Sequence, residues 1–186
     1  MDLRELYEEI EKYLDKDIEL KGWIRNHRKQ KEFGFIDFSD GTCFKHIQLV
    51  YDNSLKDFET IQKYHNGSAI TVIGTVIKSE GKGQDFEIKV KEIKLEGDCP
   101  EDYPMQPKRH SSEFLREQAY LRPRTNIFQA VFRIRSITAM AIHTYFQERG
   151  YVYFHAPLFT GSDCEGAGEM FHVTTQNLDS IAKTSK

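Results

Sequence analysis

The sequence contains few cysteines, and their spacing excludes two kinds of small, cross-linked fold. Its 186 residues include three cysteines, Cys43, Cys99 and Cys164, which lie far apart and form no CxxC pair. A zinc ribbon needs paired ligands, and a disulfide framework needs a higher density of cysteines, so neither is expected. The low cysteine content fits a protein of the reducing cytosol.

Long apolar runs are also absent. No stretch approaches the roughly 20 apolar residues that a membrane-spanning helix requires. The N-terminal sequence MDLRELYEEI is acidic and amphipathic and has no apolar core, so we do not interpret it as a signal peptide. We therefore expect a soluble, cytoplasmic protein with no membrane partner.

An overall excess of basic residues is missing as well. The formal net charge is −3, which excludes a generally basic nucleic-acid-binding protein and leaves only a local basic patch as a means of contact. Such a patch occurs in residues 21–31, where no acidic residue interrupts the basic ones. This basic cluster consists of Lys21, Arg25, Arg28, Lys29 and Lys31.

Residues 1–97 follow the order of an OB-fold barrel. Asp2 and Glu5 form a capping-box-like start, and the apolar spacing after them predicts a helix that ends near Leu14. Short alternating runs predict strands over residues 18–28, 33–38, 43–51, 69–78 and 86–95. A helix is predicted over residues 54–65. Three strands, a helix and two further strands make up a five-stranded OB-fold β-barrel.

The alternation within residues 33–38 predicts an outward-facing aromatic pair. Ile36 and Phe38 share the face that we assign to the barrel interior, so Phe33, Phe35 and Asp37 face outward. Exposed rings beside basic side chains suit single-stranded nucleic acid, because bases stack on the rings and cations hold the phosphates. Alternatively, the two phenylalanines pack beneath the N-terminal helix or a loop.

The motifs GWIRNHRKQKEFGFIDFSDGT and HIQLVYD resemble the anticodon-binding barrel of class II aminoacyl-tRNA synthetases of the aspartyl, asparaginyl and lysyl branch. By motif position, the resemblance implies that Arg28, Phe35 and Gln48 contact the anticodon. Phe35 would stack on the central uridine, and Gln48 would hydrogen-bond to its edge. On a looser alignment, Glu87 falls near the glutamate that reads the first anticodon base. Arg25, in the basic cluster, is a further candidate for anticodon binding.

The second half of the chain is predicted to begin with a linker and a long helix. Residues 98–112 contain three prolines and little apolar content, which predicts a linker or hinge. A short helix is expected over residues 113–119, and a long one over 126–149, with a cap at Thr125 or Asn126 and an end at Gly150. The apolar arc of the long helix includes Phe132 and Tyr145 and is wide. Burial against a second subunit and burial in the core of its own domain both explain this width.

The sequence ERGYVYFHAPLF, in which residues 151–154 predict a strand, resembles motif 1 of the same synthetases. In that family, motif 1 builds a homodimer interface. The resemblance therefore places Phe132, Tyr145 and Pro157 at the contact between two copies of the chain.

Residues 160–175, TGSDCEGAGEMFHVTT, combine several carboxylates and glycines. This composition is typical of a mobile loop that binds a cationic group or a metal, or of a solvated surface turn. Its SDCEGAGE form resembles asparaginyl-tRNA synthetases. The resemblance implies that Glu165 accepts the α-ammonium group of asparagine in a charge-assisted hydrogen bond. It places Ser162 in the same amino-acid site.

Two motifs of this family do not occur before Lys186. Motifs 2 and 3 carry the arginines that act on ATP, and the glutamates that hold Mg²⁺ are also absent. We therefore expect neither a catalytic residue nor a metal ligand within the chain, and an N-terminal fragment that is inactive alone. The resemblance implies an asparagine–tRNA ligase that uses ATP and Mg²⁺ and binds tRNA(Asn) and asparagine.

The expected architecture is α+β. Residues 1–97 form the OB-fold anticodon-binding domain, residues 98–112 the linker, and residues 113–186 the truncated start of an antiparallel α/β class II catalytic domain. Two other functions fit the same residues. One is a free-standing OB-fold nucleic-acid-binding module, and the other is an aspartyl-specific or nondiscriminating tRNA ligase.

Overall fold

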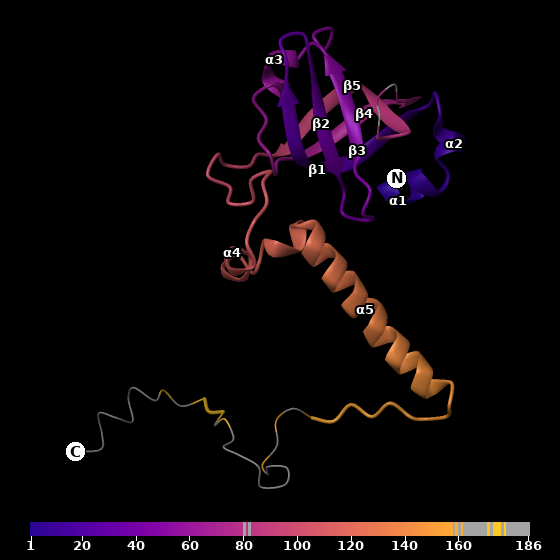
Figure 1. Ribbon diagram of the computed structural model, residues 1–186, viewed down its shortest axis with the longest axis vertical. Helices are drawn as coiled ribbons and strands as arrows, with labels where there is room; N and C mark the ends of the chain where they lie inside the picture. The colour runs from indigo at the N-terminus through magenta and orange to yellow at the C-terminus, as the bar shows by residue number, and fades with distance from the viewer. Residues whose placement is uncertain are drawn as a thin grey trace, which may run out of the picture. The chain divides into compact units, whose positions relative to one another are not determined.

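The computed structural model describes residues 1–79, 81, 83–157, 159, 161, 171, 173–175 and 177. The chain divides into two compact units, residues 1–136 and residues 137–186. The first unit contains the strands, the linker and the beginning of the long helix (Figure 1). The second unit contains the remainder of that helix and the residues after it.

Five strands close into a barrel in the order β1-β2-β3-β5-β4. Neighbouring strands are antiparallel except β3 and β5, which run parallel. The predicted five-stranded OB-fold barrel is therefore confirmed. The strands are β1 (Asp17–Lys29), β2 (Phe33–Ser39), β3 (Ile47–Asp52), β4 (Ala69–Lys78) and β5 (Phe86–Gly97).

The helices of the described residues are short, except for the last one. The capping box at Asp2 and Glu5 is present, and the first helix is interrupted at Glu9. The predicted helix over residues 54–65 is reduced to a few residues within a run of turns. The helices are α1 (Leu3–Glu8), α2 (Ile10–Tyr13), α3 (Phe58–Ile61), α4 (Ser112–Glu117), the 3-10 helix η1 (Arg122–Arg124) and α5 (Asn126–Gln147).

Strand β3 begins four residues later than predicted, because residues 40–46 form a side-chain-stabilised turn. Thr42 donates from its backbone N–H and its hydroxyl to Oδ1 of Asp40, at 2.9 and 2.7 Å. The other carboxylate oxygen of Asp40 accepts from the backbone N–H of Leu3 at 2.6 Å. Such local hydrogen bonds compete with a strand ladder, and here they also hold α1 against the barrel.

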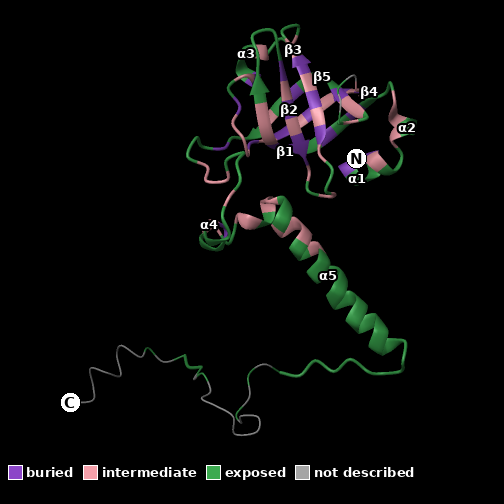
Figure 2. Ribbon diagram, in the orientation of Figure 1, coloured by how far each residue is buried: buried purple, intermediate pink, exposed green. Residues whose placement is uncertain are grey.

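The hydrophobic core lies inside the barrel and beneath α1 (Figure 2). Ile36 and Phe38 are fully buried, as the alternation of β2 predicted. Leu3 and Leu6 of α1 belong to the same core. Because the interior side chains alternate with outward-facing ones, the outer surfaces of the strands remain available for contacts with a ligand.

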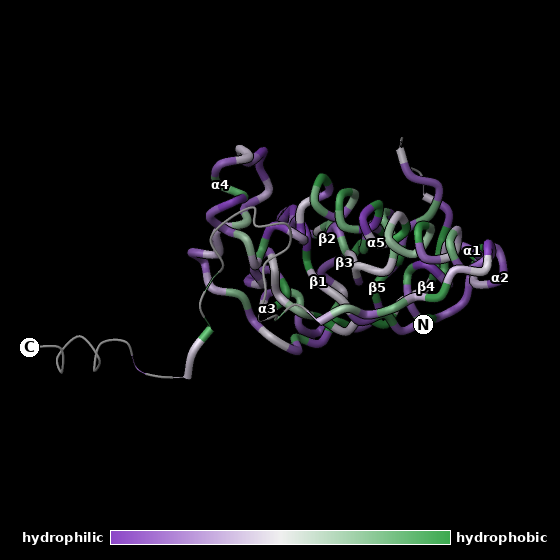
Figure 3. The backbone as a smooth tube through the Cα atoms, turned by 90° about the horizontal axis from the view of Figure 1, so that it is seen from below, coloured by the Kyte–Doolittle hydropathy of each residue, from purple (hydrophilic) through white to green (hydrophobic). Residues whose placement is uncertain are grey.

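The helix α5 is half-buried in places over its first two turns and exposed from residue 134 onward. None of its residues is buried, and Ile134, Ile137 and Met140 are 65%, 69% and 63% exposed. The tube view shows hydrophobic and hydrophilic residues interspersed along the helix (Figure 3). The hydroxyl of Thr125 accepts from the backbone N–H of Phe128 at 3.4 Å, and Gly150 has a φ of +79°, so the predicted start and end of the helix are close to the observed ones.

The strand predicted over residues 151–154 is wrong. Residues 151–157 are described and contain no strand. A strand requires a neighbour for its backbone hydrogen bonds, and no described strand pairs with this stretch.

Among the described residues, none of the helices has the length and apolar content of a membrane-spanning segment.

Candidate nucleic-acid interface

The barrel brings four of the predicted anticodon-contacting residues together from four different strands. Arg28 on β1 pairs with Phe35 on β2, and Gln48 on β3 pairs with Glu87 on β5. Gln48 also lies opposite Asp37 on β2, two positions from Phe35 on the same face. We call the outward-facing set Arg28, Phe35, Gln48 and Glu87 the reading face.

Arg28 connects the aromatic and polar parts of the reading face. Its guanidinium carbon lies 5.1 Å from the centre of the Phe35 ring, within the range of a cation–π contact. Its Nη2 donates to Oε1 of Gln48 at 2.7 Å. An arginine can satisfy both contacts because its guanidinium group is planar and carries several donors.

Glu87 accepts several hydrogen bonds on one carboxylate oxygen. Its Oε2 accepts from Nε2 of Gln48 at 3.3 Å, from Nε2 of Gln84 at 3.0 Å and from Oγ of Ser79 at 2.9 Å. Ser79 and Gln84 carry no signal in the sequence, because they lie in the turn-rich segment between β4 and β5 and belong to no motif. Their proximity to Glu87 follows from the pairing of those two strands.

The outward-facing aromatic pair lies on the surface, as the alternation predicted. The rings of Phe33 and Phe35 are 5.3 Å apart in an edge-to-face arrangement. Phe33 is 37% exposed, Phe35 is half-buried, and neither ring belongs to the hydrophobic core. These rings can offer a stacking surface to an unpaired base.

Arg25 does not join the reading face, because β1 contains a bulge. Ile24 pairs with Phe38 and Asn26 pairs with Asp37, so Arg25 is an extra residue without a partner on β2. Its guanidinium group is half-buried and donates to the backbone carbonyl of Arg124 in η1. Burial lowers the pKa of Arg25. Arg25 therefore ties the barrel to the segment before α5.

A groove of about 1520 Å³ lies beside Arg25 within the first unit. Trp23, which is 42% exposed, and Arg124 also line it. His46 and Asp37 also line this groove, and Nδ1 of His46 lies 3.1 Å from the carboxylate of Asp37. None of the four residues of the reading face lines the groove.

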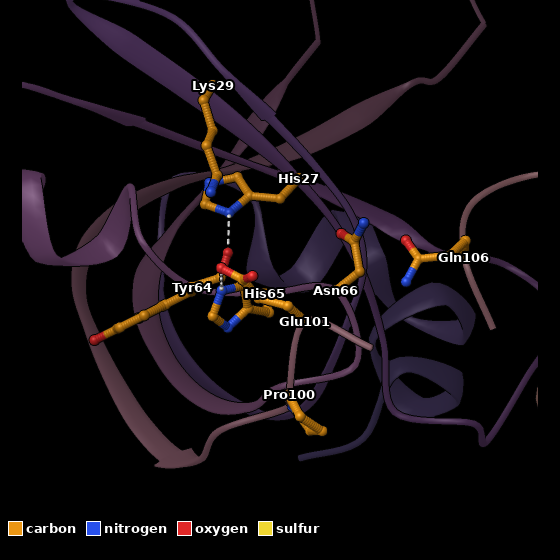
Figure 4. A pocket seen from close by; sticks show the side chains of 8 residues that line it. All are labelled: His27, Lys29, Tyr64, His65, Asn66, Pro100, Glu101 and Gln106. Atoms are coloured by element: carbon orange, nitrogen blue, oxygen red, sulfur yellow. Dashed lines mark hydrogen bonds and ion pairs between the residues drawn. The ribbon is translucent and has the colours of Figure 1, made fainter. Parts of the chain in front are cut away.

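A second, smaller cavity of about 280 Å³ lies where β1 meets residues 64–66 and the linker (Figure 4). His27 points into it and donates from Nδ1 to the backbone carbonyl of Tyr64 at 3.1 Å. Its Nε2 accepts from the hydroxyl of Tyr51 at 2.7 Å. Burial lowers the pKa of His27 to about 4. These satisfied contacts stabilise the barrel. The described residues contain no group of side chains arranged to hold a metal ion.

The residues predicted for a subunit interface are exposed in this chain. Phe132 is 37% exposed, and the guanidinium carbon of Arg122 lies 5.9 Å from its ring centre. In the second unit, Tyr145 is 52% exposed and Pro157 is exposed. Ser162 and Glu165, predicted for the amino-acid site, lie outside the described residues.

Comparison with known proteins identifies both halves of the chain. Residues 18–96 match the family model of the OB-fold nucleic acid binding domain. Residues 111–183 match that of the class II tRNA synthetases (D, K and N). A solved structure of asparaginyl-tRNA synthetase from Pyrococcus horikoshii, complexed with asparaginyl-adenylate, has a TM-score of 0.77 at 22% identity. The match covers 90% of this chain and 39% of that one, and it supports the fold alone.

Curated relatives are more similar in sequence. The asparagine–tRNA ligase of Acholeplasma laidlawii is 53% identical over 178 residues, which cover 95% of this chain and 38% of the relative. That of Clostridium kluyveri is 51% identical over 181 residues, which cover 97% and 39%. The chain thus spans about 40% of the length of the curated relatives it matches. Residues 111–183 thus match the class II tRNA synthetases of the D, K and N group, and relatives about 50% identical to the chain are asparagine–tRNA ligases.

Proposed function

We propose that the chain is part of an asparagine–tRNA ligase and that its barrel binds the anticodon of tRNA(Asn). The observation that carries this proposal is the reading face, where a cation, a ring, an amide and a carboxylate from four strands lie side by side on an OB-fold surface. The names of the relatives supply the amino acid.

Each residue of the reading face has a specific task in this proposal. Phe35 stacks on the central uridine of the anticodon, and Gln48 hydrogen-bonds to the edge of that base. Glu87 accepts N–H groups of the first anticodon base. Arg28 holds Gln48 and supports the ring of Phe35, and its charge favours the nearby phosphates. Arg25 acts at a distance from these four, because it joins the barrel to η1.

The complete ligase would activate asparagine with ATP and Mg²⁺ and then transfer it from the adenylate to the 3′ end of the tRNA. Glu165 and Ser162 would bind the amino acid, with the carboxylate of Glu165 accepting the α-ammonium group. We propose that residues 1–97 are the anticodon-binding domain, 98–112 the linker and 113–186 the beginning of the catalytic domain. A cytoplasmic location is consistent with this activity and with the low cysteine content.

We further propose that the ligase is a homodimer that buries the apolar arc of α5, including Phe132 and Tyr145, with Pro157 near the contact. The arc supports this, because contiguous apolar side chains on a helix are rarely left in water without a partner.

An aminoacylation assay tests the activity directly. The full-length protein that contains this chain should attach asparagine to tRNA(Asn) when ATP and Mg²⁺ are present. Charging of the same tRNA with aspartate at an equal rate would instead show a nondiscriminating ligase. Absence of charging with either amino acid would contradict the proposed activity.

A further inference from the structure

Hydrogen bonds link Arg28 to the segment between β4 and β5 without interruption. Arg28 donates to Oε1 of Gln48 at 2.7 Å, and Nε2 of Gln48 donates to Oε2 of Glu87 at 3.3 Å. The same Oε2 accepts from Ser79 and Gln84 at 2.9 and 3.0 Å. Gln48 thus has a cationic donor on one end of its amide and a carboxylate on the other.

These two partners permit only one orientation of the Gln48 amide. An arginine has donors and no acceptor, so the amide atom that faces Arg28 must be the oxygen. A carboxylate accepts hydrogen bonds, so the atom that faces Glu87 must be the nitrogen. Rotation of the amide by half a turn would place two donors against each other at Arg28 and two acceptors against each other at Glu87.

Ser79 and Gln84 fix the carboxylate that imposes this orientation. The hydroxyl of Ser79 accepts from the backbone N–H of Gly81 at 3.1 Å and from Nε2 of Gln84 at 3.2 Å, so its own proton is directed to Glu87. The backbone N–H of Ser79 donates to the carbonyl of Asp85 at 2.9 Å and closes the turn. Ser79 and Gln84 therefore donate to Glu87 from positions that these hydrogen bonds tie to each other.

A fixed amide orientation matters for distinguishing pyrimidines. Uridine presents an N3–H donor beside the O4 acceptor, whereas cytidine presents the N3 acceptor beside the N4 amino donor. The two edges have opposite polarity, and an amide that is free to rotate can pair with either. The Gln48 amide retains one N–H and one oxygen lone pair in a fixed order, so only one of the two edges matches in a given pose.

We propose that Ser79 and Gln84 are positioning residues that, through Glu87, lock the Gln48 amide in the orientation that selects uridine over cytidine. This inference rests on the proposed function, in which Gln48 contacts the central anticodon base. Within the described part of the chain, Oε1 of Glu87 has no hydrogen-bond partner. That oxygen remains available for a neighbouring base while Oε2 holds the amide.

The test measures binding of the 186-residue chain to two stem–loop RNAs that differ only in the central anticodon base, GUU and GCU. The unaltered chain should prefer GUU by about tenfold or more, since the cytidine edge would leave its hydrogen-bonding groups mispaired with the Gln48 amide. The double variant Ser79→Ala with Gln84→Ala should bring this preference to within about threefold. The affinity for the GCU loop should rise relative to that for the GUU loop, and this rise should account for most of the change.

Two control variants separate orientation from folding. Ser79→Thr keeps the hydroxyl donor and should retain the preference for GUU. Gln62→Ala removes an exposed amide elsewhere on the barrel, where it donates to the carbonyl of Gln30 at 3.1 Å, and should also leave the preference unchanged.

The outcomes distinguish this inference from the function on which it rests. If the unaltered chain prefers GUU and the double variant keeps the full preference, the positioning inference is overturned and the proposed function stands. The same holds if the double variant weakens both RNAs equally. If the unaltered chain does not bind the GUU loop at all, the proposed function itself fails.

Discussion

At the scale of single residues, the reading face depends on side chains that each make two different contacts. Arg28 is the clearest case, because its guanidinium lies over the Phe35 ring and also donates to Gln48. Phe35 in turn offers its remaining surface to a ligand while its edge contacts Phe33. A substitution at either residue therefore alters stacking and charge placement together.

Removal of the Phe35 ring should weaken anticodon binding chiefly through the loss of stacking. Phe35→Ala is expected to lower the affinity for a GUU stem–loop by about 1–3 kcal/mol, or roughly 5- to 150-fold. Phe44→Ala is a matched control, because Phe44 is 50% exposed and its ring contacts Arg133 away from the reading face. Fluorescence anisotropy measures the affinity of both variants for the GUU stem–loop. An unchanged affinity for Phe35→Ala would show that this ring only supports the barrel.

His27 should make the stability of the barrel depend on pH. Its pKa falls from 6.5 to about 4 in the folded chain, because burial disfavours the charged ring. Between these values the unfolded chain binds more protons than the folded one, so stability is full above pH 6.5 and is lost as the pH falls toward 4. The His27 contribution to the free energy of unfolding should fall by about 1–2 kcal/mol between pH 7 and pH 5.

Denaturant unfolding of two variants at these pH values isolates the His27 contribution. His27→Gln has no titrating ring and should lose this part of the pH dependence. His143→Gln, which replaces an exposed histidine on α5, should keep it. Equal pH dependence in His27→Gln and the unaltered chain would assign the effect to other groups.

At the scale of elements, the bulge in β1 decides which side chains the barrel presents. Before it, Ile18, Leu20 and Ile24 are buried on the even positions of the strand. The extra residue Arg25 shifts the phase, so that His27 turns inward to Tyr51 and Arg28 is exposed.

The barrel could be predicted from the sequence because the alternation of buried and exposed residues lies within single strands. Alternation in residues 33–38 correctly placed the buried residues of β2, and the bounds of β4 were predicted without error. The bulge could not be predicted, since an extra residue in a polar stretch leaves no change in hydropathy. The prediction for Arg28 came from motif position and that for Arg25 from charge. Only the structure separates Arg28 on the reading face from Arg25 in the bulge.

Close approach of β4 and β5 requires glycine at position 74. A Cβ atom at Gly74 would lie 2.5 Å from the backbone carbonyl oxygen of Lys89, which cannot move without breaking the ladder. Gly74→Ala should therefore lower the free energy of unfolding by about 1–3 kcal/mol. At Gly97, the nearest atom would be 3.9 Å away, so Gly97→Ala should have little effect. Thermal unfolding compares the stabilities of the Gly74→Ala and Gly97→Ala variants. Equal stabilities would contradict the close packing of β4 and β5 at Gly74.

At the scale of the whole molecule, we propose a different partner for each of two surfaces: a second copy of the chain for the exposed apolar side chains of α5, and RNA for the reading face. The strand expected after α5 is not formed, because a strand needs paired backbone groups and the described residues supply none. The resemblance to motif 1 rests on residue pattern alone. The backbone conformation of residues 151–157 depends on neighbours that the pattern does not contain.

The homodimer proposal predicts that charge on α5 disrupts self-association. Ile137 is 69% exposed, so Ile137→Glu should not disturb folding, yet it should weaken the dimer at least about tenfold because a buried carboxylate lacks a partner. Gln147→Glu introduces the same charge at the end of the helix and serves as control. Sedimentation equilibrium gives the mass of each. If the unaltered chain is monomeric at all concentrations, the proposal that α5 by itself forms a dimer interface is contradicted.

The central claim is that the barrel reads an anticodon, and a comparison of RNA affinities tests it most directly. The 186-residue chain is titrated with a GUU stem–loop and with an unstructured RNA of the same length and unrelated sequence, at one salt concentration. Anticodon reading predicts that the GUU loop binds at least about tenfold more tightly, since contacts to base edges add to those with phosphates. Equal affinities for the two RNAs would contradict it and would identify a barrel that binds single strands without reading them.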